Sequence, residues 1–95
     1  MTNASAVPLT SMHDLHVADK IHKLILENAL NNHLSVVKEV VIELGSVIEH
    51  GANINAENLV FNLQMLNRGT LAQGANISIK RVIGNEWKLV SISGE

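Results

Sequence analysis

The spacing of the apolar residues changes sharply along this chain, and that change limits what it can fold into. Between residues 15 and 29 apolar side chains recur every three or four positions, the period of a helix with one buried face. Between residues 37 and 44 apolar side chains alternate with others, the period of a strand with one buried face. Because each element has only one apolar face, the chain must pack helices against a sheet.

The first half of the chain is predicted to hold one helix and one strand. The helix runs from about residue 14 to residue 30, and Asn31 and Asn32 end it. The strand covers residues 37–44, where Val40, Ile42 and Leu44 form the buried face. Residues 45–53 then read as a loop.

A second helix is predicted after this loop. Asn55 is a suitable N-cap residue, and Glu57 lies in the first turn, where the helix dipole favours an acidic side chain. Apolar residues at helical spacing follow, and Gly69 occupies a position typical of a helix end. The core stripe of this helix consists of Leu59, Leu63 and Leu66.

The last part of the chain reads as a β-hairpin. Two β-branched segments flank Gly84-Asn85, a dipeptide suited to a two-residue turn. The resulting register predicts that four side chains face the helices, namely Ile77, Ile79, Val90 and Ile92. The order helix–strand–helix–strand–strand predicts an α+β fold, with two helices packed on one face of a small three-stranded mixed sheet.

The same hairpin register places three apolar residues on the other face of the sheet. Val82, Trp87 and Leu89 would form a cluster open to solvent. A tryptophan beside two aliphatic side chains is unusual on a monomer surface. This cluster is therefore predicted to be an interface for a partner protein or for a second copy of the chain.

Composition excludes several classes of function. The 95 residues suffice for one domain, and a net charge of −2 with only two aromatic residues argues against nucleic-acid binding. Cysteine is absent, so neither disulfides nor thiolate zinc sites can form. No apolar run approaches the roughly 18 residues of a membrane span. Residues 1–11 lack the features of a signal peptide and read as a disordered tail on a cytoplasmic domain, residues 12–95.

The segment Met12-His13-Asp14-Leu15-His16 concentrates metal-binding side chains. His13 and His16 are three residues apart, so a helical turn places them on one face. Asp14 adds an oxygen ligand or an acceptor for an imidazole N–H. Imidazole and carboxylate without thiolate favour Ni, Cu or Zn. Alternatively, Ser11 and Asp14 form a helix N-terminal signal and the histidines are merely solvated.

Four segments together resemble the HypA/HybF accessory proteins, which deliver nickel to hydrogenases and, in some organisms, to urease. The family's Met-His-Glu start is similar to Met12-His13-Asp14. The strand end Val41-Ile42-Glu43-Leu44-Gly45 also resembles the family pattern. The most specific similarity is the segment G-T-L-A-Q-G-A-N-I-S-I at residues 69–79, and the closing segment G-N-E-W-K-L-V-S-I at residues 84–92 also fits.

The resemblance implies a nickel metallochaperone rather than an enzyme. It implies Ni(II) held by His13 together with backbone nitrogen at Met12. The local cluster adds Asp14 and His16 in support, although His16 stands where the family usually has a serine. It further implies transfer of the metal to a nickel-handling GTPase or to a hydrogenase large-subunit precursor. An acidic residue in the loop after the first strand tends to lie near the family's nickel site, which makes Glu49 or His50 a candidate distal ligand and no more than that.

Two departures from the family leave an alternative open. Family members carry a zinc domain built on two CxxC pairs between the last two strands, and this chain has neither, so we expect no structural zinc. In the family the terminal amine of Met is also thought to bind nickel, whereas Met12 follows eleven other residues here. The alternative is a protein-interaction or dimerisation module that kept the fold without the metal.

Overall fold

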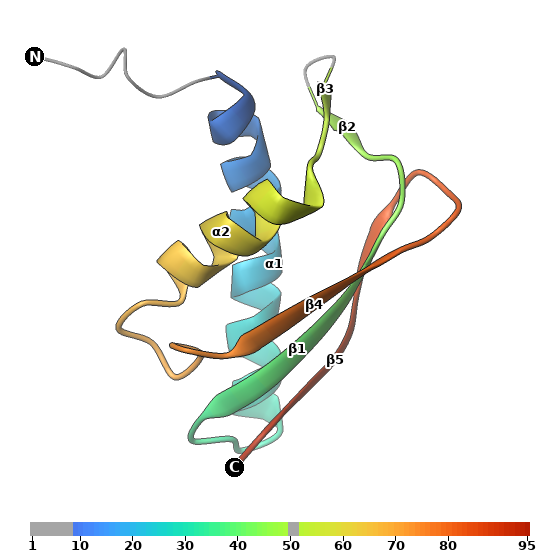
Figure 1. Ribbon diagram of the computed structural model, residues 1–95. Helices are drawn as coiled ribbons and strands as arrows, with labels where there is room; N and C mark the ends of the chain where they lie inside the picture. The colour runs from blue at the N-terminus through green and yellow to red at the C-terminus, as the bar shows by residue number, and fades with distance from the viewer. Residues whose placement is uncertain (1–8, 50–51) are drawn as a thin grey trace, which may run out of the picture.

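The structure is a computed structural model that describes residues 9–49 and 52–95, with side chains for residues 16–48 and 53–95. Two helices pack on one face of a three-stranded mixed sheet, and a small two-stranded hairpin extends from it (Figure 1). The predicted α+β fold is confirmed. In chain order the elements are α1 (Leu9–Asn31), β1 (Val37–Leu44), β2 (Ile48–Glu49), β3 (Ala52–Asn53), α2 (Ala56–Leu66), β4 (Asn76–Arg81) and β5 (Trp87–Gly94).

Helix α1 begins earlier than the sequence predicted, at Leu9 rather than near Asp14. No helix-breaking residue lies between Pro8 and Asp14, so nothing in the sequence stops the helix from starting upstream of the apolar stripe. The helix ends at Asn31, one residue after the predicted end and within the predicted Asn31-Asn32 stop.

Helix α2 is also capped as predicted. The Asn55 side chain accepts hydrogen bonds from the backbone N–H groups of Glu57 and Asn58.

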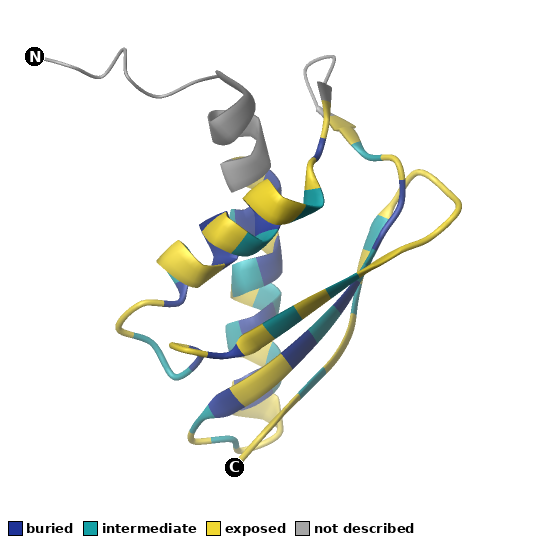
Figure 2. Cartoon of the chain, in the orientation of Figure 1, coloured by how far each residue is buried: buried dark blue, intermediate teal, exposed yellow. Residues whose placement is uncertain are grey.

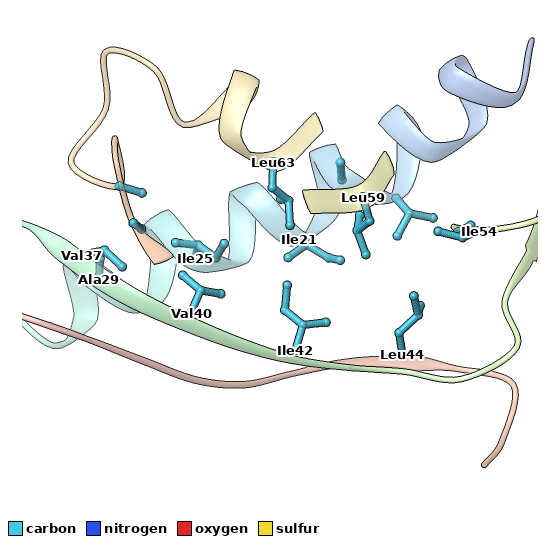
Figure 3. Close-up of a cluster of buried hydrophobic side chains, with 14 residues drawn as sticks. Ile21, Ile25, Ala29, Val37, Val40, Ile42, Leu44, Ile54, Leu59 and Leu63 are labelled. Atoms are coloured by element: carbon cyan, nitrogen blue, oxygen red, sulfur yellow. The ribbon is translucent and has the colours of Figure 1, made fainter. Parts of the chain in front are cut away.

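The core is aliphatic and lies between the two helices and the central strand (Figures 2 and 3). Ile21 and Ile25 from α1, Ile42 from β1, and Leu59 and Leu63 from α2 are all fully buried. Burying a side chain of this size contributes about 1.5–3 kcal/mol to folding. Because the core takes residues from both helices and β1, it holds α1 and α2 against one face of the sheet.

The sheet order β4-β1-β5 contradicts the predicted hairpin. β4 runs parallel to β1 and β5 runs antiparallel to it, so β1 lies between two strands that were expected to pair with each other. Strands two positions apart in a sheet are about 9–10 Å apart, which a two-residue turn does not span. All of residues 82–86 therefore form the connection, which we call the strap.

This change of partner reverses the predicted environment of Trp87 and Leu89. Trp87 pairs with Leu44 and Leu89 with Ile42, and residues directly opposite in a ladder share a face. Both side chains are half-buried and pack against the core. The predicted open-face cluster of Val82, Trp87 and Leu89 is therefore wrong, because two of its members face the helices.

Val90 is the other misplaced residue. A register shift in the β1–β5 ladder pairs Val41 with Ser91 and Ile42 with Leu89, so Val90 is an extra residue in β5. Its side chain is 43% exposed, although the hairpin register predicted that it faces the helices. The inward orientation predicted for Ile77, Ile79 and Ile92 is correct, since all three pack against the core.

The strap closes over the end of β1. The Gly45 N–H donates to Glu86 O (2.9 Å), the Ser46 N–H to Gly84 O (2.8 Å), and the Val82 N–H to Leu44 O (3.1 Å). A Cβ on Gly45 would lie 2.6 Å from Gly84 O, so only glycine allows this approach. The strap thus fixes the direction in which the chain leaves the sheet.

The segment predicted as a loop, residues 45–53, contains the short hairpin of β2 and β3. Ile48 pairs with Asn53, and Glu49 pairs with Ala52. Strands of two residues are too short to show an alternating pattern, so no periodicity in the sequence indicated them.

Candidate metal-binding end of the molecule

The start of α1 and the β2–β3 hairpin lie at the same end of the molecule (Figure 1). The opposite end holds the last turn of α1 and the final residues of the chain. The arrangement therefore brings the two segments that carry the predicted metal ligands to one end of the fold.

The principal predicted ligands lie in the first turns of α1. The backbone at Met12, His13 and Asp14 is helical, and their side chains lie outside the part that the structure describes. His16 is exposed. Because the backbone is helical from Leu9, the three-residue spacing of His13 and His16 corresponds to one helix face.

The base of the β2–β3 hairpin is anchored in the fold. The Ser46 hydroxyl donates to Asn53 Oδ1 (3.0 Å), and the Ile54 N–H donates to Val47 O (2.9 Å). Ile54 is 2% exposed and belongs to the same core cluster as Val17 of α1 (Figure 3). The hairpin therefore leaves the core beside the first described turns of α1.

The predicted distal ligands belong to this hairpin. Glu49 ends β2, and its side chain lies outside the described part of the chain, as does the whole of His50. Their role as ligands thus stays a prediction.

The described side chains do not by themselves form a metal centre. Among them, no three His, Asp or Glu residues gather closely enough to hold an ion. Asp19, one turn after His16, forms an ion pair with Lys23, in which Oδ2 and Nζ are 3.0 Å apart. The other predicted ligands, at residues 12–14 and 49–50, have side chains outside the described part of the chain.

Two other histidines, His22 and His33, lie outside the candidate metal-binding end of the molecule. His22 was predicted to be a half-buried packing residue, and it is half-buried, with Nδ1 2.8 Å from Asn67 Oδ1. The sequence did not reveal this partner, which lies 45 residues away. His33 is exposed and follows the end of α1, far from the candidate metal-binding end.

No described helix combines the length and the apolar character that a membrane crossing requires.

Comparisons with known proteins agree with the resemblance seen in the sequence. Residues 12–87 match the family model described as hydrogenase/urease nickel incorporation, metallochaperone, HypA. This family is a metallochaperone family and not an enzyme family, in agreement with the interpretation of the sequence. The matched region starts at Met12, directly before His13.

Curated relatives carry the name hydrogenase maturation factor HypA. The chain is 33% identical over 78 residues to that of Azotobacter chroococcum mcd 1, which covers 82% of this chain and 66% of the relative. It is 32% identical to that of Azotobacter vinelandii and 30% to that of Rhizobium leguminosarum bv. viciae, with the same coverage. The chain thus spans about two thirds of these relatives. Both comparisons show that this chain belongs to the HypA family.

Proposed function

We propose that this chain binds Ni(II) at the start of α1 and passes it to a partner in hydrogenase maturation. The family match over residues 12–87 carries the proposal, because it begins at the Met-His pair that the sequence analysis singled out. In this proposal His13 is the anchoring ligand, with the Met12 backbone, Asp14 and His16 in support. Nitrogen-rich ligand sets suit Ni(II).

The position of these residues suits transfer better than storage. A metallochaperone must release its metal, which an exposed site with few ligands allows more readily than a closed cage. The first turns of α1 lie at one end of the molecule, and His16 is exposed there. We propose a nickel-handling GTPase or a hydrogenase large-subunit precursor as the acceptor. A urease, which also contains nickel, is a further acceptor of the same kind.

Calorimetric titration with Ni(II) tests the site. The chain as printed and a chain that begins at Met12 are compared, each with and without the substitution His13→Ala. We expect tighter binding by the shorter chain, whose Met12 has a free amine, and loss of binding in both His13→Ala variants. His33→Ala is the matched control, because His33 follows the other end of α1.

Each outcome decides a separate part of the proposal. Equal affinity of the two chains would remove the terminal amine from the ligand set. Unchanged binding by the His13→Ala variants would reject His13 as the anchor. Glu49→Gln and His50→Ala, tested in the same way, would show whether the β2–β3 hairpin supplies a distal ligand.

A second function is favoured by one observation. Met12 lies inside α1, which begins at Leu9, so in the printed chain its nitrogen is an amide and not an amine. A protein-interaction module that kept the fold and binds partners without nickel would have no need of a free amine at Met12. Absence of Ni(II) binding by every form of the chain would support this alternative and reject the metallochaperone.

A further inference from the structure

The two edges of the sheet differ in their ability to accept another strand. Both β4 and β5 are edge strands, since β1 lies between them. The β1–β5 ladder has two register shifts, and such irregularities hinder the addition of a strand. The β1–β4 ladder is regular from Glu39↔Asn76 to Leu44↔Arg81. β4 is therefore the edge that is suited to strand addition.

An apolar groove runs beside this edge. Ala56, Glu57 and Val60 of α2 and Ile79 of β4 line it, and its volume is about 290 Å³. Phe61 follows Glu57 by one helical turn, so it lies on the same side of α2, and it is 59% exposed. A strand added to β4 would cover apolar side chains that are now partly in contact with solvent.

The backbone groups of β4 that point outward can be identified. The Val82 N–H donates to Leu44 O, and residues of a parallel strand alternate in the direction of their hydrogen bonds. Even-numbered residues of β4 therefore bond to β1. The N–H and C=O groups of Ile77 and Ile79 point away from the sheet and are available to a further strand.

The sequence of β4 is complementary to itself in an antiparallel arrangement centred on Ser78. Ile77 of one copy lies opposite Ile79 of the other, which pairs the outward backbone groups of both. Asn76 lies opposite Lys80 of the other copy, so Lys80 and Arg81 fall at opposite ends of the junction and do not face their own copies. No like charges are opposed in this register.

We propose that β4 is a dimerisation edge, where two copies of this chain join antiparallel to form a continuous six-stranded sheet. Both α2 helices then lie on the same face of the joined sheet, beside the junction. A second copy fits this edge because it supplies a strand of equal length with its charges already separated. The proposal does not depend on nickel binding.

Two serine substitutions test this edge with a matched control. Ser78 and Ser91 are both exposed, and both lie opposite Val41, one on each side of β1. In a dimer through β4, Ser78→Lys opposes two ammonium groups at the centre of the junction, which we expect to raise the dissociation constant at least about tenfold. Ser91→Lys should leave it unchanged. Sedimentation equilibrium measures both.

Charge reversal provides a rescue experiment. Ser78→Glu alone should also weaken the dimer, whereas an equimolar mixture of the Ser78→Lys and Ser78→Glu variants should restore association. Circular dichroism confirms that each variant is folded. In the unmodified chain, hydrogen exchange of the Ile77 and Ile79 amides should slow as protein concentration rises, because the dimer pairs these N–H groups.

Three results would overturn the proposal. If the chain is still a monomer at millimolar concentration, β4 does not pair with a second copy. A strand from another protein would then be the expected partner of this edge. Weakening by Ser91→Lys and not by Ser78→Lys would place the contact at β5. Failure of the mixed variants to associate would show that the two Ser78 positions do not face each other.

Discussion

His22 Nδ1 lies 2.8 Å from Asn67 Oδ1, and this contact joins α1 to the residue that caps α2. In its Nδ1–H tautomer the imidazole donates to this amide oxygen, which can only accept. Asn67 is 1% exposed, and its backbone C=O in turn accepts from both the backbone N–H and the hydroxyl of Thr70. The two helices and the turn that leads to β4 therefore meet at one buried asparagine.

We expect His22→Ala to lower the free energy of unfolding by about 1–3 kcal/mol, because it leaves the buried amide oxygen of Asn67 without its donor. Urea denaturation followed by circular dichroism measures the change. His16→Ala is the control, since His16 is exposed on the same helix, and it should stay within about 0.5 kcal/mol of the unmodified chain. Equal losses in the two variants would mean that the His22–Asn67 contact contributes nothing specific.

The end of α1 offers a stabilising substitution. His33 has a φ of 58°, a left-handed conformation in which a side chain costs about 1–2 kcal/mol. The Leu34 N–H donates to Ala29 O and the His33 N–H to Leu30 O, the pattern of a Schellman motif, which usually has glycine at this position.

His33→Gly should therefore raise the free energy of unfolding by roughly 0.5–1 kcal/mol, after the greater backbone entropy of glycine is subtracted. The same substitution one residue earlier, Asn32→Gly, should be destabilising, because no positive φ is relieved there. Thermal unfolding of both variants tests the difference in sign. A destabilised His33→Gly variant would contradict the argument.

The depth of burial predicts a difference between two core positions. Leu63 is fully buried between α1 and α2, whereas Ile79 is half-buried at the edge strand β4. Leu63→Ala should cost about 2–5 kcal/mol, since the lost contacts add to the cavity that is left. Ile79→Ala should cost less, because solvent can reach the vacated space. Urea denaturation of the two variants measures both costs, and a larger loss for Ile79→Ala would contradict this order.

The elements that the sequence predicted correctly are those with a local signal. The helical stripe from Ala18 to Ala29, the alternation in β1 and the Asn55 cap depend on neighbouring residues, and all three are present. The arrangement of the strands was not predictable in this way. A Gly84-Asn85 turn locally favours a hairpin, but β1 takes the position between β4 and β5.

In the candidate site, too, features set by neighbouring residues could be predicted from the sequence, and contacts between distant residues could not. The spacing of His13 and His16 is a local pattern, and the helical backbone of α1 agrees with it. By contrast, the partner of His22 is Asn67, 45 residues further along the chain. The position of the β2–β3 hairpin depends on the strap that holds Gly45, which no local pattern in the sequence indicated.

The strap makes Gly45 sensitive to substitution. A Cβ at this position would lie 2.6 Å from Gly84 O and 3.1 Å from Glu86 O, so Gly45→Ala must move the strap away from the end of β1. We expect a loss of about 1–3 kcal/mol, the range for overpacking at a buried position. Ser46→Ala is the neighbouring control and loses only an exposed hydrogen bond to Asn53. Thermal unfolding that leaves both variants equally stable would show that the strap adapts without cost.

The environment of Trp87 gives a final prediction that separates the observed strand order from a hairpin. Trp87 is the only tryptophan, and it is half-buried beside the core and opposite Leu44. Its emission should therefore be blue-shifted in the folded chain and move to the red in urea. Because Trp87 lies in β5 and the proposed dimer forms through β4, the emission should not change with protein concentration. A shift to the red on dilution would instead place Trp87 at an interface between copies, as the hairpin register implied.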